Sequence, residues 1–333
     1  MPSWGEILKV LQTEAQLNGG VDLDEARHKY ISQLQVLTGR NTVLYTTDYL
    51  GKGGPQTSIN LGDMQGLMEV FKGLSGGNLD LVLHSPGGQA EATESLVKYM
   101  RSKFSHVRVF VPLAAMSAAT MWATAADEIV MGKHSQLGPI DPQITLPSGI
   151  PIPAGALIEQ FEQAAQQLSA DPSRIAAWLP TLQQYQPGIL NICKSAGDLA
   201  EELVAKWLKE YMFSGDADKV NVADEIAAWL SNDKAHLSHG RALTRDQLRD
   251  KGMKIVNLED DDELQDAVLS VHHIAMHSFQ SSAVKIIQNH IGSVFIQHGG
   301  QQITVPMPVP ASVPSLTQGQ NGNLVSMTTA GLS

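Results

Sequence analysis

The feature that most constrains this fold is an apolar segment that stops abruptly at a proline and two glycines. Residues 78–84 (Asn-Leu-Asp-Leu-Val-Leu-His) predict a buried strand, and Ser85-Pro86-Gly87-Gly88 follows before a segment, 90–103, that predicts a helix. Three further strands are predicted nearby, over residues 42–47, 107–111 and 128–131. Predicted helices over residues 61–74 and 117–126 alternate with them. Short connections between alternating strands and helices require right-handed crossovers, so we expect an α/β fold with a mainly parallel sheet.

Composition divides the chain into three parts. Residues 1–38 predict an N-terminal helical lead-in, and residues 39–292 predict the main domain. The proline-rich segment 140–153 predicts an extended loop, after which the chain is mostly helical, with further helices expected over 262–291. Residues 293–333 are rich in Gln, Pro, Ser, Thr and Gly without an apolar period, which is typical of a disordered tail.

Charge and cysteine content exclude several classes of function. With 23 basic and 34 acidic residues, the net charge of −11 argues against nucleic acid or an anionic membrane as the main partner. The lone cysteine, Cys193, excludes an internal disulfide and a CxxC metal site, and it suggests a reducing compartment. No HExxH motif occurs, and we expect no metal or other cofactor. No basic region precedes an apolar stretch at the N-terminus, as it would in a secretory signal, so we expect a cytoplasmic protein.

One uncharged segment, residues 109–126, is long enough to be considered as a membrane span. It contains Pro112 and several hydroxyl residues, and alanine is its commonest residue, so its drive to insert into a bilayer is weak. We therefore expect no stable membrane span there but a buried strand followed by a buried helix.

Two corners between predicted strands and helices could support chemistry. At the first corner, Gly87 and Gly88 allow backbone N–H groups to point outward at the start of a helix, where they can stabilise an oxyanion. At the second, Ser117 stands among small residues, and the N–H of Ala118 would point the same way as the serine hydroxyl. This arrangement suits nucleophilic acyl transfer. The alternatives are a simple tight turn at the glycines and a helix N-cap at the serine.

The order of these corners resembles the Clp protease proteolytic subunit and signal peptide peptidase A, which share the ClpP/crotonase fold. Within that group, residues 116–120 and 132–143 are most similar to the serine dehydrogenase proteinase family of ClpP-class proteins. The other matching segments are Leu81-Val-Leu-His-Ser-Pro-Gly-Gly, Ala125-Ala-Asp-Glu-Ile-Val and Gly138-Pro-Ile. The resemblance is close over residues 40–145 and looser to about residue 292.

The resemblance implies a ClpP/crotonase-like peptidase domain over residues 39–292, with repeated strand-strand-helix units, a mainly parallel sheet and a helical C-terminal part. It also implies a homo-oligomer and a serine peptidase with Ser117 as nucleophile. The N–H groups of Gly88 and Ala118 would form the oxyanion hole, with Gly87 supporting the turn.

A serine hydroxyl is a poor nucleophile until a base takes its proton. The serine dehydrogenase proteinase family is described with the order Ser, Asp, His, which implies Ser117, Asp141 and His239. His239 would be the general base, and Asp141 would orient it. Asp141 before Pro142 is also an ordinary turn sequence. His134 and, by analogy with the Ser–Lys dyad of signal peptide peptidase A, Lys194 are the alternative bases.

The sequence thus predicts a serine peptidase that acts on peptide or protein substrates. The glycine-rich loop Gly51-Lys-Gly-Gly-Pro lacks the ending of a phosphate-binding loop, so the chain is expected to be ATP-independent by itself. Two other functions stay open at this point. One is a non-catalytic oligomeric scaffold of the same fold, and the other is a crotonase relative that processes acyl-CoA or another thioester.

Overall fold

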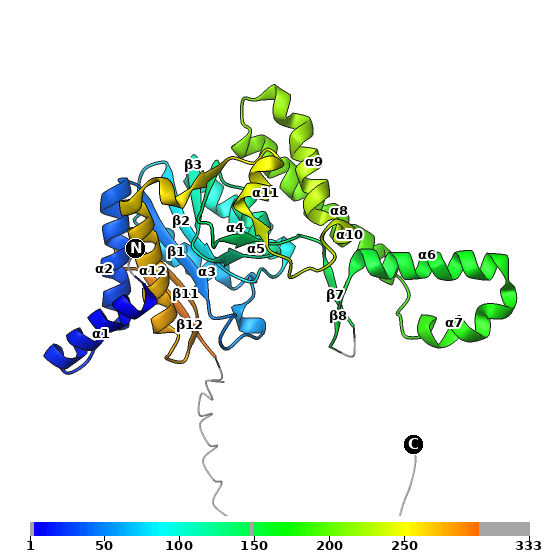
Figure 1. The fold of residues 1–333 in the computed structure, drawn as a ribbon, viewed down its shortest axis with the longest axis horizontal. Coiled ribbons are helices and arrows are strands. Elements are labelled where there is room, and N and C mark those ends of the chain that lie inside the picture. Colours follow the sequence, from blue (N-terminus) through cyan, green and yellow to red (C-terminus); the bar gives the residue numbers. More distant parts are fainter. Residues whose placement is uncertain (1–2, 147–148, 300–333) are drawn as a thin grey trace, which may run out of the picture. The chain divides into compact units, whose positions relative to one another are not determined.

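A computed structural model of the chain describes residues 3–146 and 149–299, and its centre is a seven-stranded sheet (Figure 1). The strand order is β10-β5-β3-β2-β1-β11-β12, in which the pairs from β10 to β1 are parallel and the last two pairs are antiparallel. The strands are β1 (Asn41–Thr47), β2 (Asn78–His84), β3 (His106–Val111), β5 (Glu128–Met131), β10 (Ile255–Asn257), β11 (Ala283–Asn289) and β12 (Val294–His298). The expected α/β fold with a mainly parallel sheet is confirmed.

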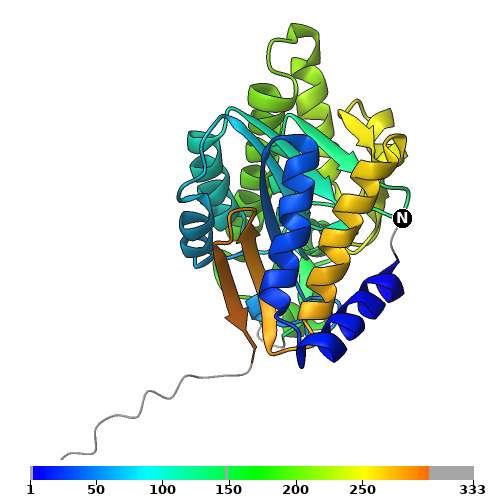
Figure 2. The same cartoon turned by 90° about the vertical axis from the view of Figure 1, so that its left-hand side faces the viewer.

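Alternate residues of the central strands enter two different cores. Val43 and Tyr45 of β1 belong to the larger core, whereas Leu44 between them belongs to the smaller one. This alternation follows from the period of two residues along a strand. The helices that contribute to the larger core include α3 (Asp63–Phe71), α4 (Ala90–Lys103) and α5 (Ala118–Thr124). On the other face, α2 (Leu23–Thr38) and α12 (Asp262–Ser278) lie side by side (Figure 2), and α1 (Trp4–Asn18) packs on α12.

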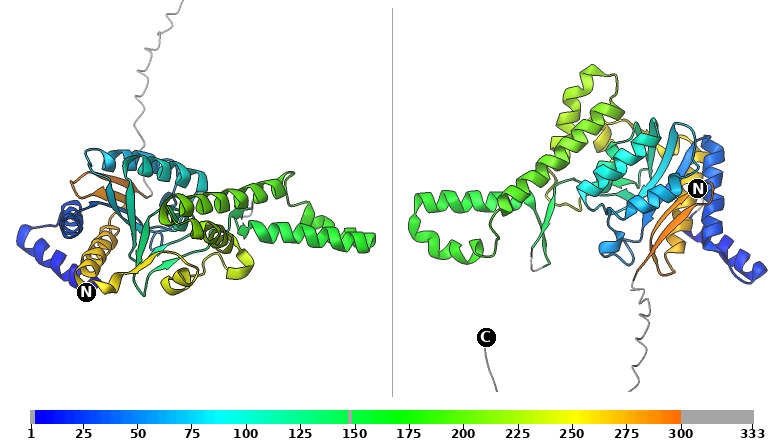
Figure 3. Two further views of the ribbon diagram at one scale, coloured as in Figure 1. Left: turned by 90° about the horizontal axis from the view of Figure 1, so that it is seen from above. Right: turned by 180° about the vertical axis from the view of Figure 1, so that it is seen from behind.

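The second half of the chain is mostly helical. Its helices are α6 (Ala154–Ala170), α7 (Ile175–Leu182), α8 (Ile189–Trp207), α9 (Val220–Ser231), α10 (Asp233–His236) and α11 (Arg245–Asp250). The C-terminal half of α8 packs into the larger core through Leu203 and Val204. By contrast, α6 and α7 extend away from the sheet (Figure 3), and α7 has no buried residue.

Two small sheets complete the fold. The first joins three two-residue strands in the order β4 (Ala114–Ala115), β6 (Gln136–Leu137) and β9 (Leu243–Thr244). The second is a hairpin of β7 (Gln143–Thr145) and β8 (Pro151–Pro153), which replaces the extended loop expected over residues 140–153.

The helices expected over residues 262–291 are only partly correct. The helix α12 ends at Ser278, and residues 283–289 form the strand β11, whose seven residues are all buried. Lys285 and Gln288 gave this segment a polar pattern, but both are buried with side-chain partners, Asp63 and Arg27 respectively. The strand β12 follows within the first residues of the tail expected from 293, and residues 300–333 lie outside the described part.

The uncharged segment 109–126 forms the end of β3, then β4, and then the buried helix α5. Within the residues that the structure describes, no helix combines the length and apolar character needed to cross a bilayer.

Candidate active site

The glycine corner after β2 and the serine corner after β4 are in direct contact. Ser85 forms a parallel bridge with Ala115, with the Ser85 N–H donating to the Ala114 carbonyl at 3.1 Å. A Cβ atom on Gly87 would lie 2.8 Å from the Cβ atom of Ser117 and 2.8 Å from the nitrogen of Ala118. Because Gly87 also has a φ of 95°, only glycine fits this contact without strain.

Ser117 has an unusual backbone conformation, with φ 51° and ψ −122°. It precedes the first residue of α5, but its side chain makes no capping hydrogen bond with that helix, so the N-cap alternative does not describe it. Non-glycine residues in such sparsely populated conformations concentrate at functional sites. The strain therefore favours a functional role for this serine.

Two backbone N–H groups lie beside this serine with no backbone acceptor among the described residues: those of Gly88 and Ala118. In the parallel bridge between Ile59 and Gly88, the bonds run from Ile59 N–H to the Gly87 carbonyl and from Gln89 N–H to the Ile59 carbonyl. The N–H of Gly88 itself therefore points away from Ile59. The N–H of Ala118 is one of the unsatisfied donors of a first helical turn.

Asp141 and His239 form a hydrogen-bonded pair beside these corners. The Asp141 carboxylate is 3% exposed and accepts from His239 Nδ1 at 2.8 Å and from Gln143 Nε2 at 2.7 Å. Because a carboxylate only accepts, Nδ1 of the imidazole carries the hydrogen and Nε2 of the neutral ring is a free base. His239 is partly exposed, at 27%, so its ring can reach a ligand in the adjoining cavity.

The register of the small sheet explains how residues far apart in sequence meet. Leu137 of β6 pairs with Leu243 of β9 in antiparallel register. Asp141 lies four residues after Leu137, and His239 lies four residues before Leu243, in a turn in which the Arg241 N–H donates to the Ser238 carbonyl at 3.1 Å. The antiparallel pairing of β6 with β9 brings the segments that carry Asp141 and His239 to the same end of this sheet. The strand β4 pairs with β6 on its other side, and Ser117 follows β4 by two residues. Each strand of this sheet thus leads to one of the three residues.

Ser117 and His239 line the same cavity, which has a volume of about 500 Å³. Gly87, Gly88 and Ala118 line it as well. The remaining wall is mixed: Met121, Ile140, Ile144 and Leu199 contribute apolar surface, and polar side chains such as Gln89 and Glu91 line it as well. A cavity that holds a serine, an imidazole with a free nitrogen and two unpaired N–H groups has the parts needed for acyl transfer.

The family is established by comparison with known proteins. The model of the ClpP-like SDH-type serine proteinases matches residues 72–268, which is more than half of the chain and includes Ser117, Asp141 and His239. The chain belongs to this family of ClpP-like serine proteinases. The expected resemblance to the serine dehydrogenase proteinase family is thereby confirmed.

The individual proteins that match this chain share 30% or less of its residues over the aligned regions. Two uncharacterized proteins of Methanocaldococcus jannaschii, MJ1495 and MJ0137, are 30% identical over 177 residues and 29% identical over 164 residues. These matches cover 53% and 44% of this chain, and the chain spans about half the length of both relatives, 51% and 56%. A solved structure, a mutant of the 1510-N membrane-bound stomatin-specific protease, has a TM-score of 0.38 and 15% identity, covering 63% of this chain and 79% of that one.

The two alternative bases, His134 and Lys194, do not line the cavity that contains Ser117. His134 is exposed, and its ring lies against Gly132 after β5, outside the residues that line the Ser117 cavity. Lys194 is exposed on α8 and is also outside that lining. Among the described residues, no group of three or more His, Cys, Asp or Glu side chains is arranged to hold a metal ion.

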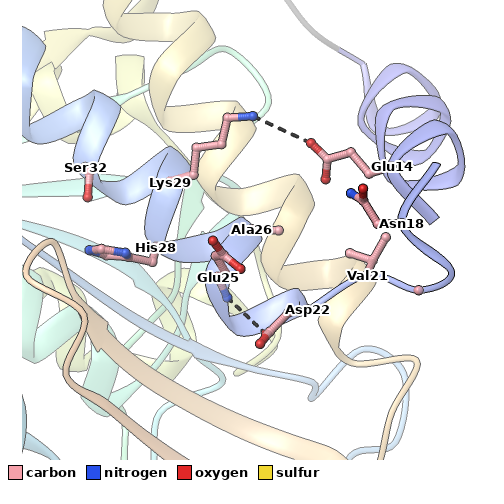
Figure 4. A pocket seen from close by; sticks show the side chains of 10 residues that line it. Glu14, Asn18, Val21, Asp22, Glu25, Ala26, His28, Lys29 and Ser32 are labelled. Carbon is pink, nitrogen blue, oxygen red and sulfur yellow. Dashed lines mark hydrogen bonds and ion pairs between the residues drawn. The ribbon is translucent and has the colours of Figure 1, made fainter.

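A larger cavity, about 760 Å³, lies between α1 and α2 (Figure 4). It also contains a serine and a histidine, Ser32 and His28. Both side chains bond to the backbone carbonyl of His290, the hydroxyl at 2.9 Å and His28 Nε2 at 2.9 Å, so the histidine is not positioned to take a proton from the serine. This cavity lacks the arrangement found around Ser117.

Two buried side chains that hold the site together, Thr120 and His84, were not predicted from the sequence. The Thr120 hydroxyl bonds to the carbonyls of Ala115 and Gly138 and accepts from the Gly138 N–H at 2.9 Å, which connects α5 to the segment before Asp141. His84 Nδ1 bonds to the Ala114 carbonyl at 3.1 Å, and burial lowers its pKa to about 4. Both residues lie within the matched motifs, but only the long-range contacts reveal their roles.

Proposed function

We propose that the chain hydrolyses peptide bonds through an acyl-enzyme on Ser117, with His239 as the general base and Asp141 as its orienting partner. The observation that carries this proposal is the bond from His239 to the buried Asp141 in a wall of the cavity that contains Ser117. Family membership supports a peptidase, and the local geometry supports these three residues.

In the proposed first step, His239 Nε2 takes the hydroxyl proton while Ser117 Oγ attacks the scissile carbonyl carbon. The carbonyl oxygen becomes an oxyanion, to which the N–H groups of Gly88 and Ala118 donate. Loss of one such donor typically costs 10² to 10³ in kcat. Gly87 supports the turn, and its own N–H donates to the Ser85 hydroxyl at 3.2 Å rather than toward a ligand.

The protonated His239 then gives its proton to the leaving amine as the tetrahedral intermediate collapses to the acyl-enzyme, which completes the first half of the reaction. In the second half of the reaction, a water molecule loses a proton to the same nitrogen as its oxygen attacks the ester carbonyl carbon, which forms a second oxyanion. As this intermediate collapses, the ester C–O bond breaks, His239 returns its proton to Ser117 Oγ, and the carboxylic acid product leaves. The buried Asp141 carboxylate stabilises the imidazolium that forms in each half. These steps use no phosphate group, so we propose that hydrolysis by the chain itself needs no ATP.

We also propose that the chain acts as a homo-oligomer. The helix α7 (Ile-Ala-Ala-Trp-Leu-Pro-Thr-Leu) carries no charge and buries no residue, and Ile175 and Leu179 are 46% and 44% exposed. Apolar surface of this kind marks contact surfaces. Size-exclusion chromatography with multi-angle light scattering of the wild type and of Leu179→Glu tests this. We expect a wild-type oligomer and a Leu179→Glu variant that dissociates into smaller species, and a wild-type monomer at micromolar concentration contradicts the proposal.

A serine-directed fluorophosphonate probe tests the catalytic proposal. We expect stoichiometric labelling at Ser117 that is abolished in Ser117→Ala and strongly slowed in His239→Ala. The matched controls are His134→Ala and Lys194→Ala, which should label at the wild-type rate. Wild-type labelling in His239→Ala would remove this histidine as the base, and binding of an acyl-CoA without any labelling would favour a thioester-processing enzyme.

A further inference from the structure

A buried ion pair lies behind the glycine corner, outside the cavity. Lys285 of β11 and Asp63 at the start of α3 are both 0% exposed, and Lys285 Nζ lies 2.6 Å from Asp63 Oδ1. Burial lowers the pKa of Lys285, and the Asp63 carboxylate opposes this shift. A buried ion pair is seldom worth its desolvation cost in stability alone, so its presence here calls for another role.

Both members of the pair hold the same short segment of backbone. Lys285 Nζ donates to the carbonyl of Ser58 at 2.8 Å. Asp63 Oδ2 accepts from the N–H of Asn60 at 3.0 Å and from the Tyr45 hydroxyl at 2.7 Å. The two charged groups therefore fix the backbone on either side of Ile59.

Ile59 is the residue that holds the glycine corner. Its N–H donates to the Gly87 carbonyl at 2.7 Å, and its carbonyl accepts from Gln89 N–H at 3.0 Å. These two bonds flank Gly88, whose Cβ position is filled by the Ile59 backbone, so no larger residue fits there. Any displacement of Ile59 would move the peptide groups on both sides of Gly88.

We propose that Lys285 and Asp63 are positioning residues for the reaction, acting through residues 58–60 to hold the Gly88 N–H where it meets the oxyanion. This inference rests on the proposed function, because it assumes that the Gly88 N–H stabilises a charge that develops during catalysis. Preorganised donors are effective because they need not reorient as the charge forms. The ion pair supplies that rigidity through two hydrogen bonds to this segment, one to the Ser58 carbonyl and one from the Asn60 N–H.

The test replaces both charges at once, in Lys285→Met with Asp63→Leu. Replacing both members of a buried ion pair by apolar residues is often neutral or stabilising. Because this variant also leaves the Ser58 carbonyl and the Asn60 N–H without these partners, its labelling is measured on protein that circular dichroism shows to be folded. We expect its rate of fluorophosphonate labelling at Ser117 to fall roughly 10- to 100-fold, below the loss from deleting an oxyanion donor outright. The pH midpoint of labelling, which reports the base, should stay at the wild-type value.

The conservative variant Asp63→Asn should retain the labelling rate that the apolar double variant loses. In Asp63→Asn the amide oxygen can still accept from Asn60 and Tyr45, and a neutral Lys285 can still donate to the Ser58 carbonyl. We expect Asp63→Asn to label within about threefold of the wild-type rate, because the hydrogen bonds and not the charges position the segment.

Asp80→Asn is the matched structural control. Asp80 is also 0% exposed and accepts from Arg40 at 2.6 Å and from Arg108 at 2.8 Å, but it lies at the opposite end of β2 from the glycines. Its replacement should lower the melting temperature without changing the labelling rate of folded protein. Wild-type labelling by the apolar double variant, or an equal loss in Asp80→Asn, overturns the inference while the peptidase proposal stands. Absence of labelling in the wild type itself overturns the peptidase proposal instead.

Discussion

The orientation of the imidazole depends on a carboxylate that only accepts hydrogen bonds, and Asp141→Asn tests this dependence. In the wild type, Gln143 Nε2 donates to Asp141 Oδ2, while Oδ1 accepts from His239 Nδ1. In the variant, the asparagine oxygen must face the Gln143 donor, so its NH₂ group faces His239 Nδ1. A flip of the Gln143 amide is disfavoured, because its oxygen would then approach the Asp141 carbonyl, from which Nε2 lies 3.5 Å.

The consequence is a change of tautomer. His239 Nδ1 would become an acceptor, and its hydrogen would move to Nε2, the nitrogen that must take the Ser117 proton. A triad whose aspartate is replaced by asparagine loses about 10⁴ in kcat for this reason. A loss of 10³ to 10⁴ corresponds to about 4 to 5.5 kcal/mol of transition-state stabilisation.

The assay is the second-order rate of fluorophosphonate labelling at Ser117, measured at pH 8 on folded protein. We expect Asp141→Asn to label 10³- to 10⁴-fold more slowly, with an unchanged fold by circular dichroism. Adding Gln143→Glu supplies an acceptor for the asparagine NH₂ group, which lets the asparagine oxygen face His239 again. The double variant should therefore label at least tenfold faster than the single one. A double variant no faster than Asp141→Asn would refute the tautomer argument, and a loss below tenfold in the single variant would refute the role of Asp141.

Three further predictions concern the surrounding structure. Gly87→Ala should abolish labelling, because the added Cβ would lie 2.5 Å from the Met116 carbonyl oxygen. The control is Gly197→Ala on α8, where the added Cβ meets no atom within 4 Å and labelling should be normal. Equal labelling rates in the two variants would contradict the contact between the corners. Thr120→Val leaves the buried Gly138 N–H without its acceptor, so the free energy of unfolding should fall by about 1 to 3 kcal/mol. Urea titration measures this, and an unchanged urea midpoint of unfolding would contradict it. Because burial lowers the pKa of His84 from 6.5 to about 4, the unfolded state binds more protons between these values, so stability present above pH 6.5 is lost as the pH falls toward 4. Between pH 7 and pH 5 this loss should be about 2 kcal/mol in the wild type and smaller in His84→Gln, and equal slopes would contradict it.

The parallel part of the fold could be predicted from sequence because its signals are local. The apolar strand over residues 78–84 and the break at Pro86-Gly87-Gly88 are contained in one short stretch, and right-handed crossovers then fix the sheet. The strand β11 could not be predicted in this way. From the sequence alone, Lys285 of this strand is expected to be exposed to solvent. It is buried because it pairs with Asp63, a residue of α3 that is far from it in sequence.

The same reasoning separates the candidate site into a predictable and an unpredictable part. The serine and the glycines are marked by local features, since each ends a strand with residues that allow close backbone approach. Asp141 and His239 were suggested by resemblance alone, and nothing near either residue points to the other. Their pairing depends on β6 and β9, strands of two residues each that carry too little periodicity to be recognised. An isolated pair of such short strands has little stability of its own, and β6 pairs with both β4 and β9, so the base and its partner are defined by the assembled fold. The pairing of β6 with β9 brings together the two segments that carry Asp141 and His239, and the hydrogen bond between these side chains then defines the base of the proposed triad.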